Sequence, residues 1–287
     1  MGAISLYMSD LYACECVMYE CDQFSSALEA TGKEKFKDVA DKLKVLVMKA
    51  VNSLQEAIKN ILNRTMFMLS LFKNRKTDKV KAYKPIATSV EDMVLIATDY
   101  TLYLTKHVTD SVKLAKNEEY GTPAILVIED AKKKTKEMYD KFMESDATAS
   151  NVANLSDFKN APIVDLNVRG LENELKAIHS NTQKQLSSIK AINNALKQTI
   201  GMSLNSYKLK AGMPYATDAD KSNYAAQQTL YSNISGLLSI TNYLYSIGIK
   251  MIYKCQVRVN QIIKNPPASH VFDSEEFVEH EALPAST

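Results

Sequence analysis

Four cysteines are the first residues whose chemistry could define a site: Cys14, Cys16, Cys21 and Cys255. A zinc site needs four ligands that converge tetrahedrally, commonly from two closely spaced pairs of Cys or His. Cys14 and Cys21 share one helical face, but Cys16 lies about 200° around the helix from Cys14, and no second pair completes the set. We therefore predict that these thiols are reduced, small and buried, and that the chain holds no metal.

The remaining residues with catalytic potential form no recognisable constellation. The four histidines are scattered, and His107 lies at helical spacing from Tyr103 and Asp110, as on a solvated or half-buried helix face. No serine or cysteine sits in a nucleophile-elbow motif, and neither glycine-rich phosphate-binding pattern occurs. These observations predict no catalytic residue, no cofactor and a protein that is not an enzyme.

A basic segment at residues 73–84 is the first candidate for binding a partner. Phosphates of a nucleic acid or an acidic protein surface are what such a run binds. The alternative, which we favour, is a solvated loop between helices, because the run has no apolar period and ends at Pro85. Its six basic side chains are Lys73, Arg75, Lys76, Lys79, Lys81 and Lys84.

The C-terminal segment, residues 266–287, is the second candidate. It carries five acidic and no Lys or Arg side chains, and Phe272, Phe277 and Val278 lie among the acids. An acidic segment with apolar anchors suits a docking peptide, and plain solvated disorder is equally common at a C-terminus. The sequence leaves these two interpretations open.

Helices must position all of these residues. The chain has 287 residues with only 8 Gly and 7 Pro, which leaves few turns for a β-sandwich or a doubly wound sheet. Apolar residues recur at a period near 3.6, most clearly over 36–72, which predicts an elongated all-α bundle of about six helices, several of them long. The expected helices cover about 5–30, 31–72, 89–115, 122–142, 171–200 and 217–264.

Two apolar stretches permit a second interpretation. Residues 124–128 could alone form a buried strand, but no second such run is available to pair with it, which favours helix. We expect Ile125, Ile128, Met138 and Phe142 to form the apolar face of this helix. Residues 222–249 carry no charged side chain. Asn and Ser interrupt this stretch, so we predict a helix buried on several sides rather than a membrane-spanning one, and we expect no membrane partner.

Composition suggests a division of the chain into parts. Residues 146–166 are rich in Ser, Asn, Ala and Asp and contain Pro162, which predicts a linker. It separates an N-terminal helical half at 1–145 from a C-terminal long-helix half at 167–265, and the acidic tail at 266–287 follows.

Charge and the N-terminus restrict the function and location. The 35 basic and 33 acidic residues give a formal charge of +2, which argues against a dedicated nucleic-acid binder. Met1–Tyr7 has neither a basic region nor an apolar run, so we expect no signal peptide and a cytoplasmic location.

The helical body is rich in Lys, Asn, Tyr and Met, lacks Trp and precedes an acidic tail, and it contains the run Ser9–Cys16. In its composition and its acidic tail, the chain resembles the helical structural proteins of large tailed bacteriophages, including those packed inside the head. Glu279–Ala282 is similar to a head-maturation cleavage site, except that Glu279 stands where an apolar residue is favoured. The resemblance implies a virion component and transfers no functional residue.

Two functions of different classes follow from the sequence. The first is a non-enzymatic structural or assembly protein that works through helix packing, protein partners and self-association. The second is a helical protein that engages membranes, as pore formers and membrane-shaping rods do. Genes for capsid and tail proteins next to this one would favour the first, and co-sedimentation with liposomes would favour the second.

Overall fold

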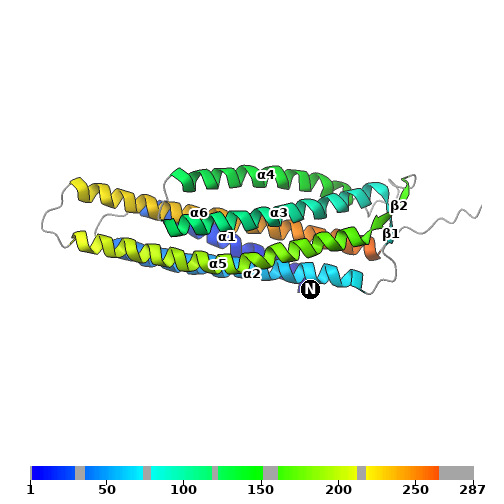
Figure 1. The fold of residues 1–287 in the computed structure, drawn as a ribbon, viewed down its shortest axis with the longest axis horizontal. Coiled ribbons are helices and arrows are strands. Elements are labelled where there is room, and N and C mark those ends of the chain that lie inside the picture. Colours follow the sequence, from blue (N-terminus) through cyan, green and yellow to red (C-terminus); the bar gives the residue numbers. More distant parts are fainter. Residues whose placement is uncertain are drawn as a thin grey trace, which may run out of the picture.

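A computed structural model of the chain describes residues 2–29, 36–73, 79–117, 122–150, 161–211 and 218–264. Helices that lie side by side in a rod account for nearly all of them (Figure 1). This confirms the predicted elongated all-α bundle, while the predicted tail lies outside the described residues. The six helices in this part of the chain are α1 (Gly2–Glu29), α2 (Phe36–Lys73), α3 (Lys84–Asn117), α4 (Thr122–Ser150), α5 (Val168–Ala211) and α6 (Asp218–Lys264).

Four of these helices form a central bundle, and two more lie on its outside. α5 packs against α2 and α3, and α6 packs against the same two helices from the other side. α1 covers the junction of α2 with α6, and α4 covers the junction of α3 with α6 (Figure 1). Helices from before and after residues 146–166 therefore interleave, so this boundary divides the chain in sequence and not in space.

The predicted apolar stripes are the faces that the bundle buries. On α2, every residue of the apolar stripe from Ala40 to Phe72 is buried. Leu54, in the middle of the stripe, is 1% exposed. The stripes of α3 and α5 are buried in the same way. Burial of an apolar side chain contributes about 1.5–3 kcal/mol, so these stripes hold the rod together.

The uncharged stretch of α6 lies at the centre of the molecule from Ile234 to Ile249. α1, α2, α3 and α4 all pack against this helix, and nearly every side chain from Ile240 to Ile249 is buried. This confirms the prediction of a helix buried on several sides. No helix within the described ranges is long and apolar enough to cross a membrane.

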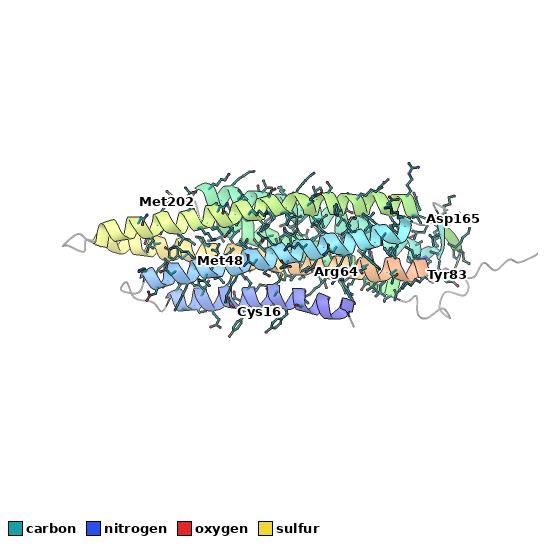
Figure 2. All side chains as sticks on the ribbon, turned by 90° about the horizontal axis from the view of Figure 1, so that it is seen from below. Cys16, Met48, Arg64, Tyr83, Asp165 and Met202 are labelled. Atoms are coloured by element: carbon teal, nitrogen blue, oxygen red, sulfur yellow. The ribbon has the colours of Figure 1, made fainter. Side chains whose placement is uncertain are left out.

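The segment predicted as a loop at 73–84 contains a strand, so that prediction is wrong. β1 (Lys79–Tyr83) pairs antiparallel with β2 (Ile163–Asn167) at one end of the rod, where Figure 2 shows Tyr83 and Asp165. Val80 and Ala82 are buried while Lys79 and Lys81 are exposed. This two-residue alternation is a strand pattern, too short to stand out beside the surrounding lysines.

Helix ends also differ from the predictions. α3 begins at Lys84 rather than near Ser89, because Pro85 lies in the first turn, where its missing N–H costs no hydrogen bond. The predicted linker at 146–166 begins with the last turn of α4 and ends with β2. The predicted face of α4 is wrong at Ile125, which is 47% exposed. α4 instead buries mostly small residues: Ala124, Ala131, Thr135, Phe142, Asp146 and Ala149.

Candidate functional site

The strand pair holds two of the predicted basic residues against one acid. Lys81 Nζ lies 2.8 Å from Asp165 Oδ1, and Lys79 Nζ lies 3.7 Å from Asp165 Oδ2. The register places Lys81 directly opposite Asp165. The hydrogen bond from Lys81 and the charges of both lysines hold the pKa of Asp165 below its usual value. Because all three side chains are exposed, the pairs add little stability, but they offset part of the segment's charge.

The other predicted anchor residues are divided between described and undescribed parts of the chain. Lys73 ends α2 and Lys84 begins α3, and both are exposed. The backbone N–H of Lys84 donates to the carbonyl oxygen of Pro162 at 2.8 Å, which ties the start of α3 to the segment before β2. Arg75 and Lys76, like the tail residues Phe272, Phe277 and Val278, lie outside the described residues. Binding of nucleic acid by this segment, the interpretation that the sequence favours less, stays a hypothesis.

The cysteines are part of the packing of the bundle. Cys14, Cys21 and Cys255 are buried, which confirms that prediction, and Cys16 on the outer helix α1 is partly exposed (Figure 2). The Ser53 hydroxyl donates to Cys14 Sγ at 3.5 Å, and Cys255 Sγ donates to the carbonyl oxygen of Met93 at 3.7 Å. Burial raises the pKa of Cys21 to about 12, which keeps its thiol protonated. In the described part of the chain, no group of His, Cys, Asp and Glu is arranged to hold a metal ion.

His107 is buried, against the prediction of a solvated or half-buried face. It is 4% exposed, and its Nε2 lies 3.1 Å from Thr241 Oγ1 on α6. Burial lowers its pKa from 6.5 to about 4, although Asp110 and Asp130 oppose the shift. The neutral imidazole therefore joins α3 to α6 at neutral pH.

This burial predicts that stability depends on pH through His107. The unfolded chain binds a proton near pH 6.5 and the folded chain only near 4, so the free energy of unfolding falls as pH drops through that range. We expect wild type to lose up to about 3 kcal/mol more than His107→Gln, which cannot titrate. Urea unfolding of both proteins at a series of pH values measures this difference. Parallel pH profiles would contradict it.

Gln185 is the centre of a polar layer inside the bundle. Its Nε2 donates to the carbonyl oxygen of Thr101 at 2.9 Å and to Thr105 Oγ1 at 3.0 Å. Its Oε1 accepts from the Tyr245 hydroxyl at 2.7 Å. One side chain thus joins α3, α5 and α6, and because unpaired polar groups are costly in the core, the layer favours one register of these helices. The sequence carried a signal for it, since Gln185 fills the gap between Thr182 and Ile189 in the α5 stripe.

A buried carboxylate joins α4 to α6. Asp146, whose side chain is 5% exposed, accepts hydrogen bonds from Lys254 and, at 2.9 Å, from Arg258. Burial alone would raise the pKa of Asp146, but these two hydrogen bonds and the two positive charges hold it below its usual value. Lys254 and Arg258 lie one helical turn apart, which brings both to the same carboxylate.

A groove of about 860 Å³ lies between α3 and α4. Apolar and aromatic side chains form part of it, and Leu102 is 57% exposed there. Burial raises the pKa of Tyr103 to about 12, with a smaller contribution from Asp130. The apolar and aromatic part of the lining includes Ile96, Leu102, Tyr103 and Met138. The charged side chains of the lining are Lys106, Lys113, Lys134, Lys141, Asp99 and Asp110.

A second group of exposed apolar side chains lies on the neighbouring helices α1 and α2. Tyr12 and Tyr19, seven residues apart on one face of α1, are 68% and 66% exposed. Val45 and Met48 of α2 are exposed at 51% and 46%. An ion pair between Lys49 and Glu20 at 2.9 Å joins the two helices. We call Tyr12, Tyr19, Val45 and Met48 the α1–α2 surface.

Comparison with known proteins identifies no relative. No family model, curated protein or solved structure matches the chain. The resemblance to structural proteins of tailed bacteriophages therefore stays a prediction.

Proposed function

We propose that the protein is a non-enzymatic structural or assembly protein, a component of a phage virion, that acts as a rigid helical rod and associates with copies of itself. The observation that carries this proposal is the α1–α2 surface. Its two tyrosines are large, rigid and apolar over most of their area, and aromatic side chains of this kind are enriched in protein–protein interfaces. Exposed on a monomer, they have no packing role.

The interior supports a structural role. The ionisable groups His107, Asp146 and Arg64 are buried, and each makes a hydrogen bond to another helix. Arg64 donates to Gln256 Oε1 at 3.0 Å and lies 5.3 Å from the centre of the Tyr253 ring. Each of these hydrogen bonds joins two helices, so the three groups make the rod more rigid.

Membrane engagement, the alternative from the sequence, requires more change in the molecule. The apolar stretch at 222–249 is the part of the chain best suited to insertion, and four helices cover α6. Insertion would therefore require the bundle to open. Self-association requires no such change, because the α1–α2 surface is already exposed.

Light scattering coupled to size-exclusion chromatography tests the proposal. The monomer has a mass of 32.1 kDa, and we expect wild type to rise above it as concentration increases. Replacing both tyrosines by serine (Tyr12→Ser with Tyr19→Ser) is expected to restore the monomer. Met202→Ser is the matched control, since Met202 is 50% exposed on α5, away from this surface (Figure 2). A wild-type monomer at every concentration would refute self-association.

A further inference from the structure

The groove between α3 and α4 combines apolar surface with an excess of positive charge. Leu102, Tyr103 and Met138 provide the apolar part. Four lysines and two aspartates line it, and Lys113 is 3.2 Å from Asp110. The net charge of the lining is positive after that pair is formed. A segment that fits here carries acidic side chains on either side of an apolar or aromatic residue.

The order of the charges along the groove makes this requirement more specific. Thr135 of α4 lies beside Tyr100 of α3, and Asp130 lies beside Tyr103, so the helices are antiparallel. Lys134 and Lys141 consequently lie toward the start of α3. Lys106 and Lys113 lie farther along it. Leu102 and Tyr103 lie between these two pairs of lysines, and Met138 lies between Lys134 and Lys141. The matching segment therefore has an apolar centre with acids before and after it.

The sequence of this chain contains such a segment after α6. Asp273, Glu275 and Glu276 precede the apolar pair Phe277–Val278, and Glu279 and Glu281 follow it. These five acids leave 28 acidic against 35 basic residues in the rest of the chain. We propose that residues 272–281 dock into the groove between α3 and α4 of the same chain, with Phe277 on the apolar surface and the acids beside the lysines.

The length of chain after α6 is sufficient for this docking. Cys255 bonds to Met93 and Tyr100 bonds to Leu244, so α6 runs antiparallel to α3 and ends level with the start of α3. Along α3, Ile96 lies about 18 Å and Lys106 about 33 Å beyond Lys84. Phe277 follows Lys264 by 13 residues, which span up to about 43 Å when extended. The extended chain is therefore longer than the distance along α3, and the extra length allows for the path around the end of the bundle.

Attachment to the same chain favours this occupant over a separate molecule. A short tether holds the segment near its groove at an effective concentration of about a millimolar, provided that it can span the distance. A second copy would have to reach a comparable concentration to compete. The docking is independent of the α1–α2 surface and of the proposed self-association.

Photo-crosslinking in the full-length chain tests the proposal. Benzoylphenylalanine replaces Phe277, and mass spectrometry identifies the attached residues after irradiation. We expect attachment near Leu102, Tyr103 or Met138 in products with the mass of a single chain. Lys106→Glu with Lys134→Glu should lower the yield about fivefold, as loss of exposed ion pairs predicts. Lys190→Glu with Lys197→Glu is the matched control, because both lysines are exposed on α5.

Each outcome decides the proposal. Restoration of the yield when Glu275→Lys and Glu276→Lys are added to the groove variant would support direct charge pairing and exclude a folding defect. Products with the mass of two chains would assign the groove to a second copy and overturn docking within one chain. Attachment elsewhere, or a yield that both lysine variants change equally, would also overturn it.

Discussion

Replacing Leu54 with aspartate is expected to unfold most of the protein at ordinary temperature. Leu54 is 1% exposed in the middle of the α2 stripe, and α2 packs against α1, α5 and α6. The substitution removes a core side chain and places a carboxylate where no cation is available in the stripe. The combined cost is roughly 5 kcal/mol or more, comparable with the whole stability of many domains. Loss of the helical circular dichroism signal in mild urea measures the effect.

Two matched variants separate burial from other effects of the substitution. Met66→Asp places the same carboxylate on the same helix at a residue that is 53% exposed, and it should leave the melting temperature nearly unchanged. Leu54→Met keeps the side-chain volume and should cost less than about 1.5 kcal/mol. If Leu54→Asp melts within a degree or two of wild type, the α2 stripe is not the core of the bundle.

The long helices could be predicted because their apolar stripes repeat many times. Over α2 the period near 3.6 persists for about ten turns, so a few misplaced residues change nothing. The same reasoning identified the uncharged stretch of α6 as core. Its composition alone resembles a membrane segment, and Asn and Ser distinguish it, because a buried helix can give them partners. The Ser235 hydroxyl of α6 donates to the carbonyl oxygen of Cys21 on α1 at 2.9 Å.

Short and polar features could not be predicted in this way. β1 and β2 have five residues each, and their pairing joins segments about 80 residues apart, which no local period reveals. α4 buries small residues, so its buried face has little hydrophobic contrast, and the larger Ile125 misled the prediction. The groove between α3 and α4 depends on how two helices pack, and its lysines read in sequence as the solvated side of a helix.

The contacts of the buried ionisable groups could not be predicted either, because their partners lie on helices that are distant in sequence. His107 resembles a surface residue when only Tyr103 and Asp110 are considered, but α6 covers it and supplies Thr241. Lys254 and Arg258 did carry a signal, because two cations one turn apart on an otherwise apolar helix require an acid. The sequence could not say that Asp146, within the predicted linker, is that acid.

Replacing Asp146 with alanine is expected to destabilise the protein by about 2–4 kcal/mol. The cost comes less from the lost attraction than from the two cations left behind, since the side chains of Lys254 and Arg258 are only 30% and 15% exposed. Removing one member of a buried ion pair costs more stability than replacing all of its members by apolar residues. Urea unfolding of Asp146→Ala, compared with Asp140→Ala at an exposed acid of the same helix, measures the difference.

Removing the cations as well should recover much of this loss. In the triple variant Asp146→Leu with Lys254→Met and Arg258→Met, no charge remains to be solvated, and apolar side chains of similar length fill the space between α4 and α6. The pH dependence provides an independent check. The folded-state pKa of Asp146 lies below the ordinary value of 3.8, so its contribution is fully present above that value and is lost as pH falls through the lower one. The acid-induced decline in stability should therefore be shallower in the triple variant. If Asp146→Ala and Asp140→Ala are equally stable, Asp146 does not hold α4 on the bundle, and the packing of small residues along α4 must do so alone.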